Sequence, residues 1–124
     1  MSKVKIMVVD DDAQSLELIE AMLVPNGYEV ITANDGAKAV AAIMVKKPNL
    51  ILLDIMMPGL DGYSTLSKLK ANNTISNIPV VMLTAVGFDL NKELAFRLGA
   101  AGYITKPVDL TELLKTISKL LTPV

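Results

Sequence analysis

Short runs rich in Val, Ile and Leu recur along this chain, and longer segments with helical spacing separate them. Each run has four or five residues and lacks alternation of polar and apolar residues, which is typical of strands buried on both faces of a parallel sheet. Strands that alternate with helices in this way indicate βαβ units. The expected strands cover residues 6–9, 29–32, 50–53, 80–83 and 102–105.

Turn and capping signals agree with this alternation. Pro25-Asn26-Gly27 is typical of the end of a first helix, and Asp35-Gly36 of the start of a second. Asp109, with Glu112 three residues later, has the pattern of a capping box at the start of the last helix. We therefore expect five strands and five helices.

Chain connectivity limits how these elements can be arranged. Right-handed crossovers favour a sheet in the order 2-1-3-4-5, with helices on both faces and the first strand beside the third. The chain has 124 residues, of which 52% are hydrophobic, and this suits one domain with a substantial core. The sequence predicts a doubly wound α/β fold in which residues 1–124 form a single domain.

Polar residues follow four of the expected strands. Asp10 and Asp11 follow the first strand, and Asp54 follows the third. Thr84 and Lys106 follow the fourth and fifth strands. Because parallel strands have their carboxyl ends at one edge of the sheet, we expect these side chains to meet in a single crevice.

A cluster of carboxylates at that edge favours a hard divalent cation. Asp10 and Asp11 beside Asp54 would repel one another, and burial raises that cost. An all-oxygen site of this kind suits Mg²⁺, whereas zinc is disfavoured because the chain has no His and no Cys. Asp12 is expected to cap the following helix instead.

Asp54 has the character of a nucleophile. It stands alone after four aliphatic residues, and a carboxylate can attack a phosphoryl donor to give an aspartyl phosphate. Lys106 and the hydroxyl of Thr84 would then stabilise the phosphoryl oxygens. The plainer alternatives are a helix cap for the acidic run, a solvated loop position for Asp54, a surface lysine at 106 and strand propensity at Thr84.

Composition excludes several other functions. The net charge is −1 and the pI about 5.3, so the basic footprint of a nucleic-acid-binding protein is absent. The start of the chain lacks a signal-peptide pattern, and no apolar run approaches the length of a membrane span. We therefore expect a cytoplasmic protein that contacts neither nucleic acid nor membrane directly.

Four motifs together resemble the receiver domain of the two-component response regulators, a family with a flavodoxin-like fold. The resemblance extends from Lys3 to about Leu121. The motifs are Val8-Val9-Asp10-Asp11, Leu53-Asp54-Ile55-Met56-Met57-Pro58-Gly59-Leu60-Asp61-Gly62, Leu83-Thr84-Ala85 and Lys106-Pro107-Val108-Asp109.

The resemblance implies a role for each of these residues. Asp54 would accept a phosphoryl group from a phosphohistidine of a sensor histidine kinase or histidine phosphotransfer protein. Asp11 and Asp54 would bind Mg²⁺ directly with the backbone carbonyl of Met56, and Asp10 would act through a bound water. Lys106 would pair with the phosphoryl oxygens.

The resemblance also implies a switch. Thr84 would move inward to hydrogen-bond the phosphate, and Tyr103 would turn inward behind it. The face made by the fourth helix, the fifth strand and the fifth helix would then bind a partner, or a second copy of the chain in a phosphorylation-dependent dimer.

Met56 and Val86, at positions that tune the phosphoryl lifetime in this family, are both apolar, which favours slow dephosphorylation. No output domain is expected within these residues.

Two other classes of function remain as alternatives. Asp10 and Asp12 have the Asp-x-Asp spacing of haloacid-dehalogenase-like phosphohydrolases, which would make Asp10 the nucleophile. However, Gln14 stands where those enzymes usually carry Thr or Val, and no large insertion could close over a substrate. A nucleotide- or flavin-binding module is disfavoured because no Gly-rich turn follows the first strand.

Overall fold

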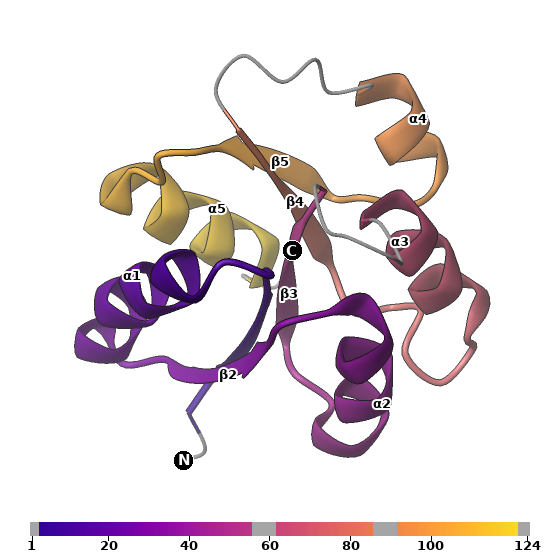
Figure 1. Ribbon diagram of the computed structural model, residues 1–124, viewed down its shortest axis with the longest axis horizontal. Coiled ribbons are helices and arrows are strands. Elements are labelled where there is room, and N and C mark those ends of the chain that lie inside the picture. Colours follow the sequence, from indigo (N-terminus) through magenta and orange to yellow (C-terminus); the bar gives the residue numbers. More distant parts are fainter. Residues whose placement is uncertain (1–2, 56–61, 86–91, 122–124) are drawn as a thin grey trace.

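A parallel sheet in the order β2-β1-β3-β4-β5 forms the centre of the molecule, with helices on both of its faces (Figure 1). The computed structural model describes residues 3–55, 62–85 and 92–121. The strands are β1 (Lys5–Val9), β2 (Glu29–Ala33), β3 (Leu50–Asp54), β4 (Val80–Thr84) and β5 (Gly102–Thr105). The predicted fold and strand order are confirmed.

In the part of the chain that the structure describes, five α-helices connect or follow the strands. They are α1 (Ala13–Leu23), α2 (Gly36–Lys46), α3 (Gly62–Ala71), α4 (Lys92–Arg97) and α5 (Leu110–Leu121). The predicted caps are present, since Asp35 accepts a hydrogen bond from the backbone N–H of Lys38 and Asp109 from that of Glu112. None of the helices in the described ranges has the length and apolar character needed to cross a membrane.

The first helical segment ends at Pro25-Asn26-Gly27 as expected, but its last turn is not α-helical. The α-helix stops at Leu23, and a 3₁₀-helix, η1 (Val24–Asn26), extends it by three residues. Pro25 has no N–H to continue the α-helical hydrogen bonds. Gly27 then ends the segment with φ of +93°, a left-handed conformation that glycine adopts without steric cost.

Two hydrophobic clusters lie on opposite faces of the sheet. Side chains from α2, α3 and α4 pack on one face, and those from α1 and α5 pack on the other, as Figure 1 also shows. Strand β3 contributes Ile51 and Leu53 to the first cluster and Leu50 and Leu52 to the second. All of β3 is buried, so Asp54 lies at the end of a strand that is covered on both faces.

Strand register places the carboxyl ends of the strands at one edge. Val9 lies opposite Leu53, Asp54 opposite Leu83, and Thr84 opposite Thr105. The residues that end these strands or follow them therefore meet at the same rim of the sheet.

Candidate functional site

Backbone hydrogen bonds continue the sheet by one residue at two of these strand ends. The N–H of Asp10 donates to the carbonyl of Ala33 at 3.1 Å. The N–H of Lys106 donates to the carbonyl of Thr84 at 2.6 Å. Asp10 and Lys106 are therefore held in register with the sheet, and each side chain starts from a fixed backbone position.

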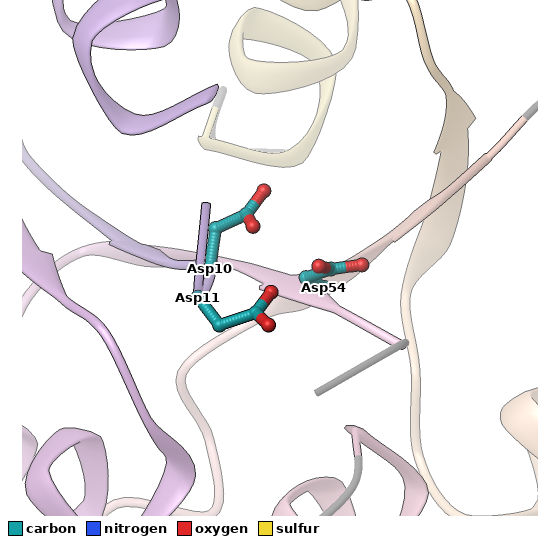
Figure 2. Close-up of side chains that lie close together, drawn as sticks. All are labelled: Asp10, Asp11 and Asp54. Atoms are coloured by element: carbon teal, nitrogen blue, oxygen red, sulfur yellow. The ribbon is translucent and has the colours of Figure 1, made fainter. Parts of the chain in front are cut away.

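Three carboxylates gather at this edge. One oxygen from each of Asp10, Asp11 and Asp54 lies within 4.8 Å of the others. Asp10 is 0% exposed and Asp54 is 5% exposed, whereas Asp11 is exposed. In Figure 2 the side chains of Asp10 and Asp11 diverge from adjacent positions, with Asp54 beside them on the neighbouring strand. The predicted convergence of the three acids is thus observed.

Lys106 supplies a positive charge to the cluster. Its Nζ lies 2.6 Å from Oδ2 of Asp10 and 3.6 Å from Oδ2 of Asp54. Burial by itself would lower the pKa of Lys106, but the hydrogen bond to Asp10 and the charges of Asp54 and Asp10 outweigh burial and raise that pKa. The ammonium therefore stays protonated at neutral pH.

The cluster fits a hard divalent cation in both charge and donor type. Three ionised carboxylates and one ammonium leave two negative charges at the site. The donors are all oxygen atoms, as Mg²⁺ prefers. Asp10 already uses both of its oxygens, because Oδ1 accepts from the N–H of Asp12 at 3.0 Å and Oδ2 accepts from Lys106. The exposed carboxylate of Asp11 is thus the more accessible ligand.

Thr84 brings an unpaired hydroxyl to the same edge. The residue is 3% exposed, and among the described residues its Oγ1 has no hydrogen-bond partner. A buried polar group without a partner costs about 1–3 kcal/mol. An oxygen atom that arrived at this edge would relieve that cost by accepting a hydrogen bond from Thr84.

The first turn of α1 also contacts the site. Asp12 caps the helix as predicted, and its Oδ1 accepts from the N–H of Gln14 at 3.0 Å. Its Oδ2 accepts from the hydroxyl of Ser15 at 3.2 Å, and the oxygen of Ser15 lies 3.4 Å from Nζ of Lys106. Sequence reasoning missed Ser15. Its position could have indicated a contact with the site, because Ser15 stands three residues after the cap Asp12, on the turn that follows the acidic run.

Gly62, the last residue of the second motif, lies against the backbone of Asp54. Its N–H donates to the carbonyl of Ile55 at 3.0 Å. A Cβ atom at this position would lie 2.6 Å from the backbone oxygen of Asp54 and 2.6 Å from Cα of Ile55. The start of α3 therefore packs directly on the backbone that carries Asp54.

The remaining predicted positions lie away from the cluster or outside the described residues. Tyr103 is 37% exposed and, with Phe96 and Leu120, lines a recess of about 400 Å³ beside β5. Met56 and Val86 lie outside the described residues.

Known proteins are similar to this chain in sequence over most of its length. The sequence model of the family described as "Response regulator receiver domain" matches residues 6–118. Protein PilH of Pseudomonas aeruginosa is 38% identical over 117 residues, which cover 94% of this chain and 97% of PilH. The probable transcriptional regulator ycf27 of Cyanophora paradoxa is 41% identical over 121 residues, which cover 98% of this chain. The chain spans only 49% of the length of that regulator.

A solved structure with the same fold contains a metal ion. The receiver domain of the sensor histidine kinase PA1611 from Pseudomonas aeruginosa superposes with a TM-score of 0.87 at 30% sequence identity. The match covers 96% of this chain and 98% of that domain, which has a magnesium ion coordinated in its active-site cleft. Taken with the family match and the geometry above, these similarities show that the chain belongs to the receiver domains of two-component response regulators.

Proposed function

We propose that Asp54 accepts a phosphoryl group, with the help of Mg²⁺, from a phosphohistidine of a sensor histidine kinase or histidine phosphotransfer protein. The observation that carries the proposal is the position of Asp54. Its carboxylate extends from a fully buried strand, within 4.8 Å of two other carboxylates and 3.6 Å from an ammonium. Residues 1–124 act as one phospho-acceptor domain in a phosphorelay.

The transfer step needs positioning and charge compensation rather than a catalytic base. An oxygen of Asp54 attacks the phosphorus atom, the P–N bond to the donor imidazole breaks, and the histidine leaves after taking a proton from solvent. Lys106 compensates the negative charge on the phosphoryl oxygens, and the hydroxyl of Thr84 donates a hydrogen bond to one of them. The chain promotes only its own phosphorylation and its slow reversal, so it is a signalling domain and not a turnover enzyme.

Asp11 and Asp54, with the backbone carbonyl of Met56, would bind Mg²⁺ directly, and Asp10 would act through a water. The hydrogen bonds that already occupy both oxygens of Asp10 support this division. When bound, Mg²⁺ supplies neutralisation of the charge that develops on the phosphoryl oxygens.

Loss of the exposed carboxylate should weaken the metal site. We expect Asp11→Asn to lower the affinity for Mg²⁺ at least about tenfold, because the ion loses one of its charged ligands. Binding of Mg²⁺ stabilises the folded state by mass action. The melting temperature of the unmodified chain should therefore rise with added Mg²⁺ and fall again with a chelator, while that of Asp11→Asn should respond much less.

Glu17→Gln is the matched control, because it removes an exposed carboxylate from the nearby helix α1 without touching the acidic cluster. Its response to Mg²⁺ should equal that of the unmodified chain. Equal responses of Asp11→Asn and Glu17→Gln would contradict the assignment of Asp11.

Phosphorylation would also drive the switch. It adds about 1.5–2 negative charges at the end of β3, and Thr84 gains the partner that it lacks among the described residues. We expect Tyr103 to turn inward and the face of α4, β5 and α5 to bind an effector or a second copy of the chain. The recess beside Tyr103 supports this choice of face.

The phosphorylated state is expected to be long-lived. Met56 and Val86 are apolar, and neither side chain can orient a water molecule for attack on the aspartyl phosphate. The decay of labelled aspartyl phosphate, followed after removal of the donor, should take much longer than seconds. A lifetime of seconds would contradict this part of the proposal.

The environment of Asp10 disfavours the phosphohydrolase alternative. In the phosphohydrolase alternative Asp10 is the nucleophile. However, Asp10 is 0% exposed, and both oxygens of its carboxylate accept hydrogen bonds. Asp54 lies at the same edge, where Oδ2 of its carboxylate is 3.6 Å from Nζ of Lys106.

A further inference from the structure

We propose that Ser15 is a positioning residue for Lys106, which it holds at the site through its hydroxyl oxygen. This inference rests on the proposed function, because it concerns the lysine that would pair with the phosphoryl group. Ser15 belongs to none of the motifs that carry the family resemblance.

Within the described residues, the ammonium of Lys106 contacts side chains from three separate parts of the chain. Nζ lies 2.6 Å from Asp10 after β1, 3.6 Å from Asp54 at the end of β3, and 3.4 Å from the oxygen of Ser15 in α1. An ammonium group has three protons to donate, so three acceptors can fix its direction as well as its position. Ser15 is the only uncharged acceptor among these three contacts.

The cap of α1 orients the hydroxyl of Ser15 as an acceptor. A serine hydroxyl has a single proton, and that proton is donated to Oδ2 of Asp12 at 3.2 Å. The other oxygen of Asp12 accepts from the N–H of Gln14 at 3.0 Å, which fixes the carboxylate in turn. The lone pairs of Ser15 therefore remain for Lys106, and the helix cap and the lysine are linked through one hydroxyl.

Phosphoryl transfer is sensitive to such positioning. A lysine side chain has about 2 kcal/mol of rotamer entropy to lose, and the side chain of Lys106 is 22% exposed. Without Ser15, the two carboxylates are the remaining contacts of the ammonium among the described residues, and they restrict its direction less than three acceptors do. Misplacement of a charge-compensating group slows the reaction without abolishing it.

The test uses the full chain with acetyl phosphate and Mg²⁺ as reagents. We expect Ser15→Ala to slow phosphorylation of Asp54 about fivefold, the effect of losing one modest hydrogen bond. Ser15→Thr keeps the hydroxyl and should restore most of the rate. In a Lys106→Ala background, Ser15→Ala should cause no further loss, because the residue through which it acts is gone.

A spectroscopic measurement separates positioning from helix stability. The ¹H–¹⁵N signal of the Lys106 ammonium, assigned by its absence in Lys106→Ala, should be visible in the unmodified chain and in Ser15→Thr. It should broaden in Ser15→Ala through faster exchange with water, at a temperature where thermal melting shows that all variants are folded.

Two outcomes would overturn the inference. One is an unchanged phosphorylation rate and an unchanged ammonium signal in Ser15→Ala. The other is that Ser15→Ala slows phosphorylation by the same factor in the Lys106→Ala background as in the unmodified chain. Failure of the proposed function itself looks different, because the unmodified chain would then incorporate no phosphate at all.

Discussion

Replacing Asp54 with Asn should abolish incorporation of phosphate from a small-molecule phosphodonor and from a phosphorylated histidine donor. The substitution keeps the size and the buried position of the side chain but removes the charged oxygen that attacks phosphorus. Because it also relieves repulsion within a cluster of three carboxylates, we expect the variant to be folded and at least as stable as the unmodified chain. Intact mass measurement and incorporation of labelled phosphate would detect the loss.

Glu20→Gln is the control for this experiment, since Glu20 is an exposed carboxylate on α1. It should incorporate phosphate at the unmodified rate. Stable incorporation by Asp54→Asn would refute the assignment of Asp54, and it would revive Asp10 as a nucleophile in the manner of the phosphohydrolases.

Replacing Gly62 with Ala is the second change with a large expected effect. The added methyl group would meet the backbone oxygen of Asp54 and Cα of Ile55 at 2.6 Å, and backbone atoms cannot rotate away as a flexible side chain can. Overpacking of this kind costs about 1–3 kcal/mol. We expect the free energy of unfolding, measured with urea, to fall by that amount. We also expect slower phosphorylation, because the backbone that carries Asp54 has to shift to make room for the methyl group.

Gly102→Ala provides a matched control, because a Cβ atom there meets nothing within 4 Å. Its free energy of unfolding should change by less than about 0.5 kcal/mol. If Gly62→Ala were as stable and as reactive as Gly102→Ala, the close packing of α3 on Asp54 could not matter for the site.

Much of the architecture could be predicted because the signals are local and repeated. The continuous apolar run at 50–53 indicates burial on both faces, and β3 is buried throughout. Handedness of the crossovers then leaves few sheet orders, and the order in turn requires Asp10, Asp11 and Asp54 to meet. The convergence of the acids is thus a consequence of topology and does not depend on details of packing.

Features that depend on the direction of individual side chains could not be predicted from such local sequence patterns. The link from Asp12 through Ser15 to Lys106 requires the helix to start at one particular residue and in one orientation. The contact of Gly62 with the backbone at Asp54 depends on how closely α3 approaches the sheet. The peptide bond between Lys106 and Pro107 is cis. A Lys-Pro sequence is compatible with either isomer and does not determine which one forms.

The unequal burial of the strands has a consequence for how the site can respond to a ligand. The strand that carries Asp54 is buried at every position, whereas in the strand that leads to Lys106 only Ile104 is buried. Regions with little buried apolar surface open at lower free-energy cost than core strands do. Asp54 is therefore anchored in a fully buried strand, whereas the backbone that leads to Lys106 lies at the edge of the sheet. Backbone adjustment to an incoming group should therefore occur more readily along β5 than along β3.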